Sequence, residues 1–306
     1  MSRIVSFTRF GGTDVLEVIE AETGTPGPGE VLVEVRAAGL NPVESGIRGG
    51  FLQQVYPTTF PARQGKDLAG VVTAVGPDVT GFAAGDEVVG FTTAPGTQAE
   101  TVVVPATHLT ARPAGVPWEV AGALFTAGAA ACASVRAVAV TAGDTVVVAN
   151  AAGGVGSIAV QLARLAGATV IGLAGPVHHD WLRAHDIVPV AYGEGAEQRI
   201  KDASGGTVDA FIDAFGAAYV DLAITLGVRP ERINTLMNFA AAGRYGVKAR
   251  GSNDAATPEV LAELAGLVAD GRLEVPVEAT YPLDRVAEAY QHLERRHTLG
   301  KIVVIP

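Results

Sequence analysis

A glycine-rich segment is the strongest chemical signal in the chain: VVVANAAGGVGS at residues 146–157 follows an apolar run and leads into an amphipathic stretch. Glycines let a backbone turn sharply and approach a pyrophosphate closely, and the helix that follows offers free N–H groups and the positive end of its dipole. A purely structural tight turn is the alternative. We predict a dinucleotide-binding turn whose contacts come from Ala152, Gly153, Gly154, Val155 and Gly156.

The next apolar run ends in LAGPVH at residues 173–178, without a carboxylate. An acidic residue at this point commonly selects NAD, because it accepts hydrogen bonds from the ribose hydroxyls. Its absence favours NADP(H) over NAD. Gly175 and His178 are therefore candidate cofactor contacts, and His179 or Arg183 are further candidates for the phosphate. The alternative is that these residues form an exposed helix start.

Strands and helices are predicted to alternate around these two segments. Apolar β runs lie at 145–149, 169–173, 187–192, 208–214 and 232–236, and helical stretches at 155–166, 178–185, 194–203 and 218–226. This alternation predicts a parallel sheet covered on both faces. Ligands of open α/β sheets bind at the carboxyl ends of the strands, so Phe215 and Phe239 are candidate cofactor contacts. Ordinary packing explains Phe239 equally well.

The rest of the chain has a different pattern. Short strands between Gly- and Pro-rich turns suggest a compact barrel-like domain; they lie at 30–37, 68–75, 87–91 and 101–104. Residues 117–139 are apolar all round and predict one buried helix. The last 55 or so residues do not continue the alternation, so we expect them to return to the barrel. The expected domains are 1–112 with 251–306, and 113–250.

Composition excludes several classes of function. The 306 residues carry a net charge of −10, which argues against a nucleic-acid partner. The single cysteine, Cys132, cannot form an intramolecular disulfide or a multi-cysteine zinc site, and its alanine-rich surroundings predict an inert buried thiol. No apolar stretch predicts a membrane span, and the first ten residues do not resemble a secretory signal. We therefore expect a cytoplasmic protein.

Five segments resemble one known family. AAGGVGSIAVQLARLAGATVIG at 151–172, GLNPVE at 39–44, GKDLAGVV at 65–72, FAAGDEV at 82–88 and LGKIVV at 299–304 occur in the order seen in the zinc-independent quinone oxidoreductases, the zeta-crystallin-like group of the medium-chain dehydrogenase/reductase superfamily. The resemblance covers nearly the whole chain. It implies an α/β fold with a Rossmann doubly wound parallel sheet, a GroES-like β-barrel catalytic domain, and a homodimer or homotetramer.

The resemblance also implies roles for single residues. Tyr192 matches a tyrosine that the family places after the third strand of the sheet, and Asn41 would hold the nicotinamide ribose or orient the ring. A turn-forming asparagine before Pro42 is the alternative. Tyr56 lies where relatives carry aromatic pocket residues; it would donate a proton or, as we favour, pack. The chain departs from relatives at two positions, Asn150 in place of glycine and Ala130 in place of threonine.

The zinc-dependent branch of the superfamily uses Cys, His and Glu ligands. Here residues 41–45 lack the cysteine, and Lys66 and Asp67 stand where a His–Glu pair would be, so we predict no metal site. We expect Lys66 and Asp67 to form an ion pair in its place; we favour a structural role for this pair, and a chemical role is the alternative.

Without a Lewis acid, alcohol oxidation is difficult, whereas hydride addition to a conjugated acceptor is easier. A hydroxyl, a water or the cofactor ribose would supply the proton. The leading hypothesis is therefore an NADPH-dependent oxidoreductase that reduces quinones or α,β-unsaturated carbonyl compounds. The alternatives are a biosynthetic enoyl reductase, and a non-catalytic NADPH-binding protein with a structural or sensing role.

Overall fold

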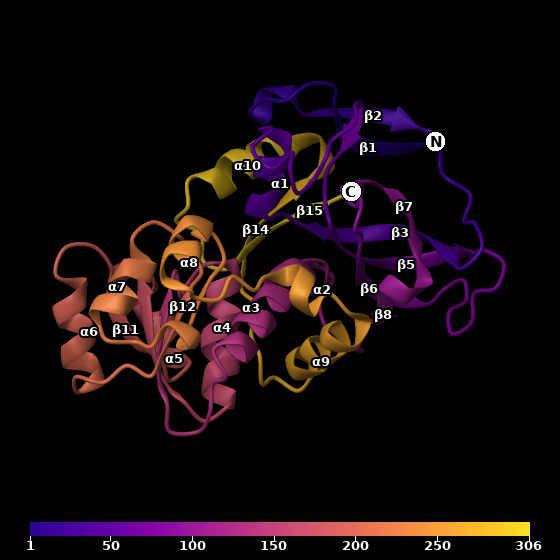
Figure 1. Ribbon diagram of the computed structural model, residues 1–306. Helices are drawn as coiled ribbons and strands as arrows, with labels where there is room; N and C mark the ends of the chain where they lie inside the picture. Colours follow the sequence, from indigo (N-terminus) through magenta and orange to yellow (C-terminus); the bar gives the residue numbers. More distant parts are fainter. The chain divides into compact units, whose positions relative to one another are not determined.

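The computed structural model describes residues 1–306 and divides into two compact units (Figure 1). The split unit comprises Met1–Thr126 and Thr257–Pro306, and the inserted unit comprises Ala127–Ala256. The expected boundary at 112 precedes helix α2 (Trp118–Gly122), which packs against strands of the split unit and so belongs to it; the expected boundary at 251 lies a few residues before the observed one. None of the helices is long and apolar enough to cross a membrane.

The split unit is built from two sheets. The smaller has the order β2–β1–β4, and the larger has the order β14–β15–β3–β5–β6–β8, with β7 also paired to β3. The strands are β1 (Ser2–Phe7), β2 (Glu17–Ala21), β3 (Glu30–Gly39), β4 (Ala62–Arg63), β5 (Asp67–Val75), β6 (Glu87–Phe91), β7 (Thr101–Pro105), β8 (Leu109–Ala111), β14 (Val277–Pro282) and β15 (Lys301–Ile305). Besides α2, its helices are α1 (Pro42–Arg48), α9 (Pro258–Ala269) and α10 (Val286–Glu294).

Strand β3 organises the split unit, because it pairs with β7 along its first half, with β15 at its end, and with β5 along most of its length. Its inward residues alternate along the strand, and Val31, Val33 and Val35 belong to one apolar cluster with Leu68 and Val88. A β-strand sends successive side chains to opposite faces, so this alternation buries one face of the sheet. The C-terminal strand β15 thus completes a sheet that begins near the N-terminus.

The inserted unit contains a five-stranded parallel sheet with the order β11–β10–β9–β12–β13, as predicted from the alternation of strands and helices. The strands are β9 (Thr145–Ala149), β10 (Thr169–Ala174), β11 (Val188–Ala191), β12 (Ala210–Asp213) and β13 (Ile233–Thr235). From the central strand β9, the chain adds β10 and then β11 on one side of the sheet. It then returns to add β12 and β13 on the other side of β9. Ligands of doubly wound sheets bind at such a switch point.

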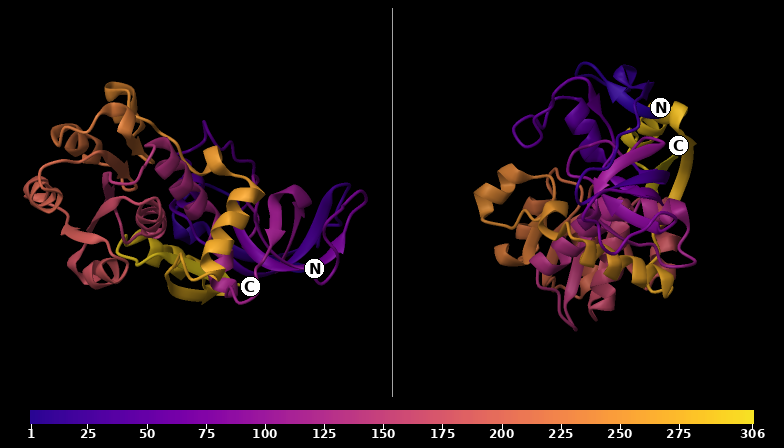
Figure 2. Two further views of the ribbon diagram at one scale, coloured as in Figure 1. Left: turned by 90° about the horizontal axis from the view of Figure 1, so that it is seen from below. Right: turned by 90° about the vertical axis from the view of Figure 1, so that its right-hand side faces the viewer.

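Helices lie on both faces of this sheet (Figure 2). The helices of the unit are α3 (Phe125–Ala137, which starts at the end of the split unit), α4 (Gly154–Leu165), α5 (His179–Ala184), α6 (Ala196–Ser204), α7 (Tyr219–Thr225) and α8 (Phe239–Tyr245). Val147, Ile171 and Phe211 face a cluster that includes Ile200 of α6 and Val220 of α7. On the opposite face, a Cβ at Gly172 would lie 3.2 Å from Leu182 of α5.

The single helix predicted at 117–139 is wrong: α2 ends at Gly122, and α3 begins at Phe125. The cause is a cap from a distant strand. The carboxylate of Asp67 accepts a hydrogen bond from the Thr126 amide at 3.1 Å and another from the Thr126 hydroxyl. A carboxylate satisfies the free N–H groups of a helix start and interacts favourably with its dipole, so a second helix begins here.

Candidate functional site

The glycine-rich turn joins β9 to α4 at the carboxyl end of the sheet. Asn150 has a left-handed backbone with φ 57°, which asparagine tolerates. A Cβ at Gly156 would lie 1.9 Å from the Asn150 carbonyl oxygen, so only glycine allows the first turn of α4 to pack on the end of β9. The structure thus explains why the pattern requires a glycine at this position.

The N-terminus of α4 fits a bound pyrophosphate. Gly153 is the N-cap residue, and no side chain caps the helix. The first amide groups of a helix have no intrahelical acceptor, so those of Gly154, Val155 and Gly156 are available to an anion. Ala152 is buried beneath the turn. All five residues predicted for the dinucleotide turn therefore lie together at one helix start.

The ends of β10 and β11 form the adjoining part of the same edge. A Cβ at Gly175 would lie 3.7 Å from the Tyr192 ring, which places these two predicted residues side by side. His178 is half-buried and ends the short turn after Gly175. Arg183 is instead paired with Asp180 at 2.7 Å on the exposed side of α5.

Arg199 is a basic residue at this edge that the sequence reasoning missed. Its guanidinium donates hydrogen bonds to the carbonyl oxygens of Ala191, at 2.9 and 3.1 Å, and Tyr192, at 3.3 Å. The Arg199 side chain therefore returns from α6 to the carboxyl end of β11. The only sequence signal was an arginine one helical turn into the helix that follows Tyr192.

The ends of β12 and β13 carry the two predicted phenylalanines. Phe215 follows β12, and Phe239 is the first residue of α8 after β13; both are exposed. Between them, the buried Asp213 carboxylate accepts hydrogen bonds from the amides of Phe215 at 3.0 Å and Gly216 at 2.7 Å, and from the Thr235 hydroxyl at 2.7 Å. Burial raises the pKa of Asp213, and these three donors oppose the rise. Asp213, also missed from the sequence, fixes both loops.

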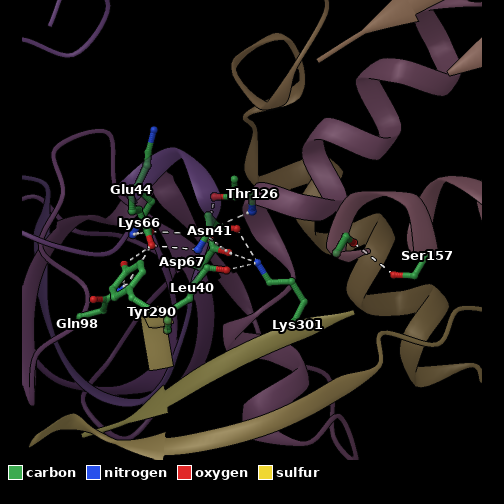
Figure 3. A network of polar contacts seen from close by, with 11 residues as sticks. Leu40, Asn41, Glu44, Lys66, Asp67, Gln98, Thr126, Ser157, Tyr290 and Lys301 are labelled. Carbon is green, nitrogen blue, oxygen red and sulfur yellow. Dashed lines mark hydrogen bonds and ion pairs between the residues drawn. The ribbon is translucent and has the colours of Figure 1, made fainter. Parts of the chain in front are cut away.

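A buried polar network forms the second candidate region, in the split unit (Figure 3). The Lys301 ammonium donates hydrogen bonds to the Leu40 carbonyl at 2.8 Å and to the Asn41 side-chain oxygen at 2.5 Å. It lies 3.8 Å from the Asp67 carboxylate, which also accepts from the Asn41 amide nitrogen at 3.1 Å. Both ends of the Asn41 side chain are therefore held by charged groups.

Glu44 extends this network on the other side of Asn41. Its carboxylate accepts hydrogen bonds from the Asn41 backbone at 3.0 Å, the Lys66 backbone at 3.1 Å and the Tyr290 hydroxyl at 2.6 Å. Burial raises the pKa of Glu44, and burial also lowers the pKa of Lys301. Because burial makes each charged form unfavourable by itself, this region is stable only if the opposite charges of Glu44 and Lys301 compensate each other.

The expected ion pair between Lys66 and Asp67 is not formed. The ion-pair partner of Asp67 is Lys301, whereas the Lys66 ammonium lies 4.9 Å from the centre of the Tyr56 ring. Consecutive residues of a strand point to opposite faces, so neighbours at the start of β5 do not meet. Asn41 and Tyr56, the two predicted catalytic residues, thus belong to one region, linked through Lys66 and Asp67.

No group of three or more His, Cys, Asp or Glu side chains is arranged to hold a metal ion. The inserted unit can instead bind a dinucleotide phosphate at α4, and the split unit by itself contains a network of buried, hydrogen-bonded charges. Cys132 is buried in α3, as expected.

Comparison with known proteins identifies two matching family models. The description "Alcohol dehydrogenase GroES-like domain" matches residues 27–117, and "Zinc-binding dehydrogenase" matches residues 184–304. The first match confirms the GroES-like domain expected from the resemblance. The zinc named in the second description has no equivalent cluster of ligands in this chain.

Individual relatives and solved structures are similar to this chain over most of its length. The chain is 30% identical to the chloroplast envelope quinone oxidoreductase homolog of Arabidopsis thaliana, with 97% of this chain and 95% of that protein covered. It is 35% identical to erythronolide synthase EryA2 of Saccharopolyspora erythraea over 90% of this chain, but it spans only 8% of that protein. The structure of Escherichia coli quinone oxidoreductase complexed with NADPH superposes with a TM-score of 0.90 at 27% identity, with 100% of both chains covered.

The buried charges predict a large effect of removing Lys301. The substitution Lys301→Met leaves Asp67 buried without its cation, so we expect the free energy of unfolding to fall by about 3–5 kcal/mol. Urea denaturation measures this. Lys201→Met, which breaks only the exposed pair with Glu197, is the control and is expected to change stability by less than about 0.5 kcal/mol. Equal losses in the two variants would contradict the assigned role of Lys301.

Two glycine-to-alanine substitutions are predicted to change the stability of the protein in opposite directions. Gly156→Ala places a Cβ against the Asn150 carbonyl, so we expect it to destabilise the protein by at least about 1–3 kcal/mol and to abolish nucleotide binding. Gly266→Ala, in the middle of α9 with no atom within 4 Å of the added Cβ, should stabilise by about 0.5–1 kcal/mol. Thermal unfolding and nucleotide fluorescence measure both. Normal stability and binding in Gly156→Ala would refute the close packing described here.

Proposed function

The chain belongs to the zinc-independent quinone oxidoreductase group of the medium-chain dehydrogenase/reductase superfamily, and on that premise we propose that it is an NADPH-dependent reductase of quinones or α,β-unsaturated carbonyl compounds. The observation that carries the proposal is the uncapped start of α4 at the switch point of a doubly wound sheet. The amides of residues 154–156 would hold the pyrophosphate there, and NADPH when bound supplies the hydride.

The edge after β10 and β11 supports NADPH as the reduced cofactor. No carboxylate follows β10 to accept from the ribose hydroxyls or to repel a 2′-phosphate. Arg199, Tyr192 and His178 instead bring a permanent positive charge, a hydroxyl and an imidazole to this edge. We propose that these three residues and Gly175 surround the 2′-phosphate.

The other predicted site residues differ in how far their side chains are already engaged by contacts within the protein. Phe215 and Phe239 are exposed at the carboxyl ends of β12 and β13, and we propose that they shelter the nicotinamide half of the cofactor. The Asn41 side chain is fully engaged with Lys301, Asp67 and Glu44, so we propose that it positions the loop before α1. Tyr56 would line the acceptor site beside Lys66.

The acceptor is proposed to be electrophilic by conjugation. Hydride addition to a quinone or enone moves an electron pair onto an oxygen that the π system already polarises. A cation or a hydrogen-bond donor can then stabilise that oxygen.

Enoyl reduction in a biosynthetic pathway is the second candidate. The specific observation in its favour is the 35% identity to a short part of erythronolide synthase EryA2, which exceeds the 30% identity to the Arabidopsis quinone oxidoreductase homolog. Both candidates use the same cofactor site, so the choice of acceptor separates them.

Turnover assays test the proposal directly. Purified protein with NADPH and 9,10-phenanthrenequinone or 1,4-benzoquinone should lose absorbance of the reduced nicotinamide faster than an enzyme-free blank, and NADPH should be oxidised faster than NADH. An enone and an enoyl thioester form the second panel. Turnover of the thioester alone would select the biosynthetic reading. Binding of neither nucleotide would overturn the proposal as a whole.

Arg199 predicts the cofactor preference. A hydrogen bond to a charged group contributes about 1.5–3 kcal/mol, so Arg199→Ala should raise KM for NADPH about 10- to 100-fold. KM for NADH should change little, because NADH lacks the 2′-phosphate. Arg229→Ala, which removes an exposed arginine paired with Glu231, is the matched control. An equal loss with NADPH and NADH would indicate that Arg199 only supports the fold.

A further inference from the structure

We propose that the Lys66 ammonium stabilises the negative charge that develops on the carbonyl oxygen of the acceptor, and that the substrates are therefore acceptors with a conjugated carbonyl group. The inference rests on the proposed reductase function and extends it, because it names the group that takes the place of a Lewis acid. Lys66 was expected to pair with Asp67, with a structural role favoured over a chemical one. Its observed surroundings give it a different role.

Lys66 is unusual among the lysines of the chain. Its side chain is only 6% exposed, and its ammonium has neither a hydrogen-bond acceptor nor a carboxylate partner. The other three lysines are all engaged: Lys201 pairs with Glu197, Lys248 donates to the Ala137 carbonyl, and Lys301 contacts Leu40, Asn41 and Asp67. Lys66 Nζ is not among the fully buried polar atoms that lack a partner, so the ammonium reaches solvent at the end of a buried stem.

Tyr56 provides the contact that the Lys66 ammonium makes inside the protein. The ammonium lies 4.9 Å from the ring centre, within the range of a cation–π interaction. An aromatic face attracts the charge but leaves the N–H donors of the ammonium unused. The pair therefore holds a cation ready to donate to an oxygen atom that arrives from outside the protein.

The backbone presents Lys66 rigidly. Its amide donates to Glu44 at 3.1 Å, and its carbonyl accepts from the Thr92 amide at 2.9 Å. The next residue, Asp67, is fixed by Asn41, Thr126 and Lys301 on the opposite side of the strand. Figure 3 shows the Lys66 side chain pointing away from this network. Preorganised donors of this kind stabilise a developing charge without reorganisation during the reaction.

The chemistry balances without a further reactant. The reduced nicotinamide delivers a hydrogen with two electrons to the acceptor carbon, and the electron pair of the acceptor's double bond moves to its oxygen. Lys66 donates a hydrogen bond to that oxygen and keeps its own proton. A proton from solvent then completes the reduced product.

Three variants test the inference with a carbonyl acceptor, 1,4-naphthoquinone or 2-cyclohexenone, and with N-methylphenazinium, a hydride acceptor that develops no oxyanion. Lys66→Met removes the charge and the donors at similar volume, and we expect kcat with the carbonyl acceptor to fall about 10²- to 10³-fold. The loss with N-methylphenazinium should be much smaller. Lys66→Arg should recover part of the carbonyl rate, and Lys201→Met should behave as the unmodified protein.

Stability separates a catalytic from a structural role. Because the Lys66 ammonium contacts only the Tyr56 ring, we expect the Tm of Lys66→Met to be close to that of the unmodified protein, with NADPH binding by fluorescence retained. A lower Tm with equal losses for both acceptors would show a structural role and overturn the inference. A higher KM with kcat retained would show ground-state binding of an anionic substrate, and would also overturn it.

The failure of the inference is distinguishable from failure of the proposed function. If the unmodified protein reduces quinones or enones and Lys66→Met does so at the same kcat, only the inference is wrong. If the unmodified protein binds NADPH but reduces no carbonyl acceptor, the proposed function fails and the role of Lys66 fails with it.

Discussion

The buried ammonium of Lys301 is the interaction on which the split unit depends. It reaches from β15 to the end of β3, to the residue before α1 and to the start of β5, through Leu40, Asn41 and Asp67. Because Asp67 also caps the start of α3, one cation fixes elements that are separated by as many as 261 residues in the sequence. Desolvation makes each of these charges unfavourable alone, so the network is stable only when all members are present.

This network also separates two roles that charged residues play in the same region. Asp67, Glu44 and Lys301 satisfy one another and hold the backbone in place. Lys66 is held by that backbone, yet its own ammonium is left to an aromatic ring. Electrostatic preorganisation requires a donor without an acceptor that is held by neighbours whose own hydrogen bonds are satisfied. Neighbours that could rearrange would weaken the electric field at the donor.

Local patterns predicted much of the fold, and long-range contacts explain what they missed. The turn at 152–156 and the alternating strands were predictable because glycine spacing and apolar periodicity are properties of neighbouring residues. The break between α2 and α3 was not, because its cap is Asp67, 59 residues earlier in the chain. Arg199 escaped notice because its contact with Tyr192 requires α6 to fold back on β11. The supposed Lys66–Asp67 pair treated sequence neighbours as spatial partners, although a strand points them apart.

The order of the two units along the chain has a consequence for synthesis. The inserted unit is one continuous segment, Ala127–Ala256, and can form all its internal contacts as soon as that segment has left the ribosome. The split unit cannot, because its strand β15 and the Lys301 ammonium are made only after the whole inserted unit. Until then, Asp67 and Glu44 belong to a nascent chain that keeps them hydrated. Residues 1–126 therefore remain partly folded until β15 has been made, and a chain truncated before residue 301 is expected to be a target for degradation.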